Sequence, residues 1–130
     1  MIDEDLRSLI LADPAVSNLI ATNGVYPQRL PQDVTKPCIV YKVWDGAPDK
    51  VAGGTSAIKR YSVDISVYSE TYGVMRQIVQ ALINLFQGLG VEEGGSMITG
   101  SRVQNVINDY ESFIELYSST LDITLIAKEI

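Results

Sequence analysis

The chain has 130 residues, of which 46% are hydrophobic and 20% charged, so it suffices for one globular domain. Sixteen acidic and ten basic residues give a net charge of −6, which argues against a sequence-independent grip on the phosphate backbone of nucleic acids. The N-terminus is acidic and no apolar run approaches the length of a membrane span. We therefore expect a protein made in the cytoplasm, with neither membrane nor sequence-specific nucleic acid as a partner.

The N-terminal segment, from Asp3 to Ala21, carries apolar residues at helical spacing. Asp13-Pro14 interrupts this pattern, because aspartate is a good N-cap and proline is favoured at the first helical position. The segment is predicted to form two short consecutive helices or one kinked helix.

Three prolines then follow within eleven residues, Pro27, Pro31 and Pro37. Each proline fixes its own φ and disfavours a helical conformation in the residue before it. The segment is predicted to be a rigid extended strap between the N-terminal helices and the first central strand. Its aromatic and aliphatic residues, Tyr26 and Leu30, are expected to anchor it in apolar contacts.

Two central strands are predicted next. The run from Cys38 to Trp44 is almost continuously apolar and suits an inner strand, whereas Tyr61 to Val67 alternates between apolar and polar residues. Residues 45–57 between them are small or turn-forming, which predicts a long flexible loop. Val40, Trp44 and Tyr68 have the opposite parity to the expected core positions, which makes the second sheet face partly apolar. An interface on this face and scattered surface aromatics are the two explanations, and we favour the interface.

The C-terminal half contains one clear helical pattern, from Tyr72 to Leu89, followed by two strands. The first of these, 97–110, loses its alternation at Val106-Ile107 as a β-bulge would make it. The second is centred on 120–125. The whole chain, 1–130, is thus predicted to be a single α+β domain. It would have a single-layer, mainly antiparallel sheet of four or five strands, with the N-terminal helices and one long central helix on one face.

Catalytic chemistry has little support. The chain has no histidine, the usual general base and commonest transition-metal ligand. Cys38, the lone cysteine, is expected to be a buried structural thiol. Five carboxylates could pair or hold magnesium, but solvated charges explain them better: Asp64, Asp109, Glu111, Glu115 and Asp122. We predict no enzyme activity, and no catalytic, cofactor or metal-binding residues.

Three motifs in order, Leu9 to Val16, Val25 to Pro31 and Pro37 to Tyr41, resemble the tail completion, or tail terminator, proteins of long-tailed bacteriophages. The similarity continues through Tyr61 to Tyr68 and the following helix. The resemblance implies a virion protein that forms a hexameric ring at the head-proximal end of the tail. Its partners would be other copies of itself, the major tail tube protein and the head-completion, or stopper, protein of the head connector.

The resemblance also places ring and tube contacts on the loop between the central strands. The residues to which this role maps are Asp45, Pro48, Asp49, Lys50, Gly53 and Gly54. For the acidic balance, we consider two explanations: a ring lumen that repels DNA and lets it slide, or solubility before assembly.

Two other function classes stay open. One is a neighbouring neck or head-completion protein of the virion, which phage gene order would separate from a tail terminator. The other is a cytosolic regulatory α+β domain that binds a small ligand, which a stable dimer with a closed pocket would favour.

Overall fold

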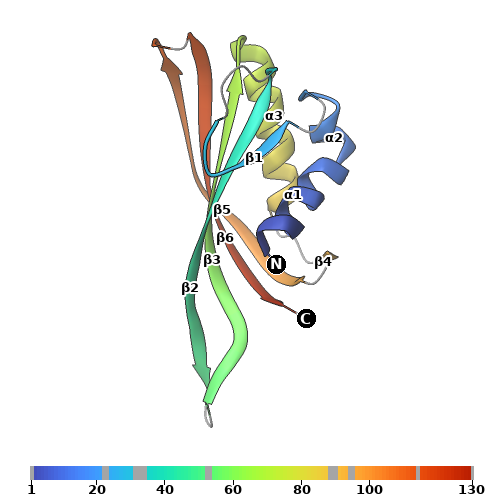
Figure 1. Cartoon of the computed structure of the whole chain (residues 1–130), viewed down its shortest axis with the longest axis vertical. Coiled ribbons are helices and arrows are strands. Elements are labelled where there is room, and N and C mark those ends of the chain that lie inside the picture. The colour runs from blue at the N-terminus through green and yellow to red at the C-terminus, as the bar shows by residue number, and fades with distance from the viewer. Residues whose placement is uncertain are drawn as a thin grey trace.

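The computed structural model describes residues 2–21, 24–30, 35–51, 54–87, 91–93, 96–113 and 115–129. These residues form an α+β structure in which three helices lie against one face of a twisted sheet, and none of them covers the other face, here called the open face (Figure 1). The helices are α1 (Ile2–Ala12), α2 (Pro14–Ser17) and α3 (Tyr72–Phe86). The strands are β1 (Val25–Pro27), β2 (Cys38–Val51), β3 (Gly54–Ser69), β4 (Val91–Glu93), β5 (Ser96–Glu111) and β6 (Leu116–Glu129).

The break between α1 and α2 lies at Asp13. Its carboxylate accepts a hydrogen bond from the backbone N–H of Ala15 at 3.2 Å, and Pro14 occupies the first helical position. These are the N-cap interactions expected from the Asp-Pro pair. Of the two predicted alternatives, the N-terminal segment therefore forms two short helices.

The sheet has six strands in the order β1-β2-β3-β6-β5-β4. β1 pairs in parallel with β2, and the other four pairings are antiparallel, so the sheet is mixed. The expected strand number of four or five is therefore too low, and the expected mainly antiparallel sheet is instead mixed because β1 is parallel to β2. The extra strands, β1 and β4, have three residues each, which is too short for a period of two to be recognised in the sequence.

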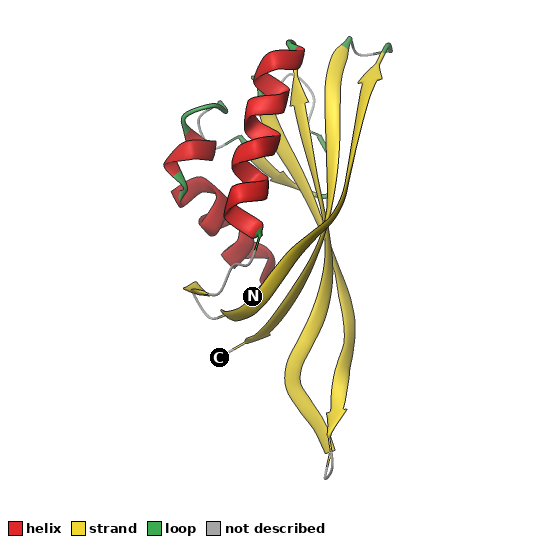
Figure 2. Cartoon of the chain, turned by 180° about the vertical axis from the view of Figure 1, so that it is seen from behind, coloured by secondary structure: helices red, strands yellow, loops and turns green. Residues whose placement is uncertain are grey.

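The core lies between the helices and the sheet (Figure 2). Alternate residues of β3 and β6 face α3, which covers them with one apolar stripe, as the helical spacing predicts. The α3 residues buried in this way are Met75, Ile78, Val79, Leu82 and Phe86. Asn105, Asp122, Asp64 and Lys42 form a row on the opposite, open face, because they are successive register partners across four strands.

Residues 45–57, predicted to be a flexible loop, are instead largely part of an antiparallel hairpin. β2 continues to Val51 and β3 starts at Gly54, and the pairing reaches these two residues. The side chains here gave no strand signal because a ladder is held by backbone groups, which every residue except proline can supply. Pro48, which has no N–H, lies where the register shifts on both sides.

Two bulges bend β5, between Ile98 and Gly100 and between Val103 and Asn105. The predicted bulge at Val106-Ile107 is therefore misplaced by a few residues. Val106 and Ile107 pair regularly with β6, with Val106 packed against the core and Ile107 60% exposed. The broken alternation in the sequence reflects an apolar residue on the open face.

Candidate assembly surfaces

The first surface is the outer part of the β2–β3 hairpin, here called the arm and defined as residues 46–51 and 54–58. β3 pairs with β6 only from Ser69 to Lys59, and beyond Lys59 it pairs with β2 alone. Figure 1 shows the arm extending past the rest of the sheet at the end away from the β5–β6 turn. A two-stranded ribbon is marginally stable by itself in water, so the arm is suited to pack against another molecule.

Most of the residues predicted to make assembly contacts fall on or beside this arm. Asp45, Pro48, Asp49 and Lys50 lie in β2, and Gly54 is the first residue of β3. Gly53 lies outside the described residues, and for the others the structure describes the backbone only. The hairpin thus brings the described residues of this set together along one projection.

The second surface is the strap. Its first part is β1, an edge strand, which confirms the extended conformation predicted from the prolines. Backbone hydrogen bonds from Gln28 N to Tyr41 O at 2.8 Å and from Ile39 N to Gly24 O at 2.7 Å hold it to β2. Arg7 of α1 donates through Nε to Val25 O at 3.0 Å. The strap is therefore tied to both the helices and the sheet.

Tyr26 and Leu30 are half-buried, whereas Pro27 is exposed. The role of Tyr26 and Leu30 as anchors of the strap stays a prediction. Pro37 is half-buried and follows a cis peptide bond, and Pro31 lies outside the described residues.

Next to the strap, Cys38 is buried beneath the open face, which agrees with the structural thiol predicted for it. Burial raises the pKa of the Cys38 thiol to about 11, against an opposing effect of Lys36. The thiol is therefore almost entirely protonated at neutral pH and poorly nucleophilic.

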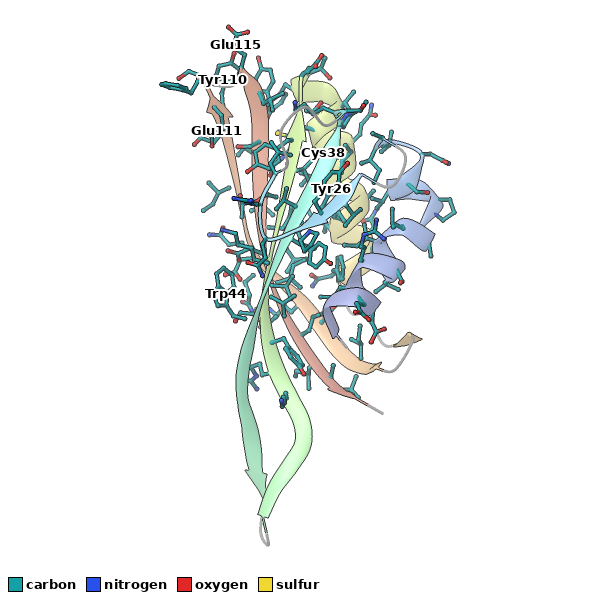
Figure 3. The ribbon with its side chains drawn as sticks, viewed as in Figure 1. Tyr26, Cys38, Trp44, Tyr110, Glu111 and Glu115 are labelled. Carbon is teal, nitrogen blue, oxygen red and sulfur yellow. The ribbon has the colours of Figure 1, made fainter. Side chains whose placement is uncertain are left out.

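The third surface is the turn between β5 and β6, here called the tip and defined as the described residues of 109–117. Tyr117 makes edge-to-face ring contacts with Tyr110 at 4.9 Å and with Tyr72 at 5.7 Å between ring centroids. Phe113 is fully exposed, and Glu111 and Glu115 flank it. Figure 3 shows Tyr110, Glu111 and Glu115 together at this end of the molecule. The aromatic residues Tyr110, Phe113 and Tyr117 were the sequence signal from which this surface could have been found. From the sequence, Glu111 and Glu115 were interpreted only as solvated charges.

The fourth surface is a shallow hollow of about 380 Å³ on the open face, here called the arginine hollow. It spans three strands where β5 is bulged, with Arg60 from β3, Thr124 and Ile126 from β6, and Arg102 from β5. Bulges bend a strand and increase its twist, which opens space between neighbouring side chains. The sequence could not reveal this hollow, because it depends on which residues become register partners.

In the described part of the chain, no group of three or more histidine, cysteine, aspartate or glutamate residues is placed to hold a metal ion. The five candidate carboxylates separate into Asp64 and Asp122 on the open face and the remaining three at the tip. As for membranes, none of the described helices combines the length and apolarity that a crossing requires.

The arrangement is that of a protein with a projecting arm and several exposed contact surfaces around a one-sided helix and sheet core. The family model of the tail completion protein gp17 matches residues 4–126, so the chain belongs to this family of phage tail proteins. It is therefore a structural component of the virion. This confirms the resemblance and sets aside the small-ligand regulatory domain.

Solved structures share the fold. One chain, from the "virion of native gene transfer agent (GTA) particle", aligns with a TM-score of 0.76 and 15% identity, over 98% of this chain and 94% of that one. A second solved chain aligns with a TM-score of 0.54 and 17% identity, over 99% of this chain and 90% of that one. No curated protein sequence is significantly similar. At these identities the structural matches establish the fold alone.

Proposed function

We propose that this protein completes the phage tail by forming a ring, most simply a hexamer, on the head-proximal end of the tail tube. The ring would then present the surface onto which the head connector docks. The family assignment over nearly the whole chain carries this proposal, since its description is that of a tail completion protein. The likeness to a chain of a virion particle supports an assembled state.

The arm supports the proposal physically. Its described strands lie beyond the third strand that stabilises the rest of the hairpin, so in an isolated subunit they pair only with each other. In a ring on a tube, the arm is available to pack against the neighbouring copy or against the major tail tube protein. Backbone pairing and apolar burial at such a contact would give the arm the stability that the monomer does not provide.

The experiment is electron microscopy of purified tail tubes that lack this protein, before and after its addition. We expect ring-shaped density at one end of each tube, and averaging of end-on views should give the number of copies. Bare tube ends in the presence of folded protein would overturn the proposal. Density on isolated head connectors instead of tube ends would favour the neighbouring neck or head-completion role.

A further inference from the structure

The arginine hollow is a positively charged site in an acidic chain. Arg60 and Arg102 are both exposed, and the described residues that line the hollow include no carboxylate. Within the described part of the chain, neither guanidinium has an ion-pair partner. Two exposed arginines around a concave apolar and hydroxyl surface favour an anionic ligand that also has an apolar part.

The tip has the complementary properties. Phe113 is fully exposed, which is unusual for an aromatic side chain, and Glu111 and Glu115 lie on either side of it in sequence. Glu115 adopts a φ of 55°, a left-handed conformation that usually falls to glycine or asparagine. A glutamate at such a position is consistent with a carboxylate that is needed there.

We propose that the tip of one copy docks into the arginine hollow of a second copy, with Phe113 in the hollow and the Glu111 and Glu115 carboxylates beside Arg60 and Arg102. The two surfaces are different patches of the same chain, so the contact is heterologous, and repeated contacts of this kind close into a ring or continue as a filament. Closure into a ring rests on the proposed function. The docking itself rests on the charge and shape of the two surfaces.

Cysteine cross-linking on tail tubes tests this contact. Gly100 lies at the hollow and has open space where a side chain would begin, and Ser112 is an exposed tip residue next to Phe113. A chain with Gly100→Cys and Ser112→Cys should form disulfide-linked oligomers under mild oxidation, seen on non-reducing gels. Background from Cys38 is low because that thiol is buried.

The matched control pairs Ser112→Cys with Ser8→Cys, because Ser8 is also exposed but lies on α1, in the helix layer. A true contact places the two thiols at an effective concentration in the millimolar range, so we expect about tenfold more cross-linked product than in this control. Equal yields in the two chains, with rings visible on the tubes, would overturn the docking and leave the proposed function intact. Equal yields with bare tube ends would count against both.

Charge reversal provides the specificity test in the same cross-linking background. Adding Arg60→Glu and Arg102→Glu should lower the yield about tenfold, because each arginine would be replaced by a like charge facing the tip. Combining these changes with Glu111→Lys and Glu115→Lys should restore it. If Arg60→Glu and Arg102→Glu left the yield of cross-linked product unchanged, the docking would be overturned. If that reversal also abolished binding of duplex DNA to the protein, the hollow would serve nucleic acid instead.

Discussion

Asp64 of β3 and Asp122 of β6 are direct cross-strand partners on the open face of the sheet. Lys42 of β2 is the partner of Asp64 on the other side. Burial raises the pKa of Asp64 above its ordinary value, the charge of Asp122 raises it further, and Lys42 opposes the rise. Like charges directly opposite each other in a sheet are destabilising. The open face therefore carries an electrostatic repulsion at neutral pH.

Replacing Asp122 by asparagine should stabilise the protein. Asp122→Asn removes the repulsion while preserving the shape of the side chain, and we expect the free energy of unfolding at neutral pH to increase by about 0.2–1 kcal/mol. Urea titration followed by circular dichroism measures this change. Asp109→Asn is the control, because it removes the same charge from the same face, where the cross-strand partner is Ser118. Equal stabilisation by both variants would indicate a net-charge effect instead.

The pH dependence of folding stability provides an independent test of the repulsion between Asp64 and Asp122. The pKa of Asp64 is raised in the folded state above its ordinary value of 3.8. At a pH between 3.8 and the pKa of Asp64 in the folded protein, the native state therefore binds more protons than the unfolded chain. The contribution of Asp64 to stability therefore increases as the pH falls through this window. The advantage of Asp122→Asn over the natural chain should accordingly narrow as the pH is lowered from neutral toward 3.8. An advantage that widens would contradict this assignment.

The sequence predicted those strands and helices whose apolar residues recur at a regular spacing along a short stretch of chain. The alternation of Tyr61 to Val67 and the stripe on α3 both follow from burial of one face. The arm was missed because its pairing uses backbone groups, and the arginine hollow because Arg60 and Arg102 are brought together only through the register of β3, β6 and β5. Local patterns do not encode such distant pairings.

The strap should contribute to folding stability through Tyr26. This residue is half-buried beside its register partner Val40, so Tyr26→Ala should lower the free energy of unfolding by about 1–2 kcal/mol. Arg29→Ala, at an exposed position of the same segment, should change it little. The measurement is urea denaturation of both variants. If the two variants were equally stable, the prediction that Tyr26 anchors the strap in apolar contacts would be wrong.

Shortening the arm should separate folding from assembly. Replacing residues 49–58 by Asn-Gly joins the register partners Pro48 and Lys59 through a two-residue turn, the commonest hairpin connection, and retains Arg60. Because the core contains no described residue of the removed segment, the thermal midpoint should stay close to that of the natural chain.

The same variant should fail to form ring density on tail tubes. Electron microscopy of tube ends, with the natural chain imaged in parallel, measures the fraction of capped tubes. An undiminished fraction would show that the arm is dispensable for tail completion. A chain that does not fold would instead show that the arm contributes to the stability of the monomer, although it pairs with no third strand.

Glu115 offers a prediction in which stability and assembly move in opposite directions. Glu115→Gly relieves the left-handed backbone strain at a φ of 55° and should raise the free energy of unfolding by up to about 1 kcal/mol. The same change removes one carboxylate of the tip, so it should weaken cross-linking to the arginine hollow. Gln28→Gly is the matched control, because Gln28 has a φ of 70° but lies at the end of β1. It should affect stability in the same direction and leave cross-linking unchanged, whereas equal effects of both variants on cross-linking would rule out a role for the Glu115 charge.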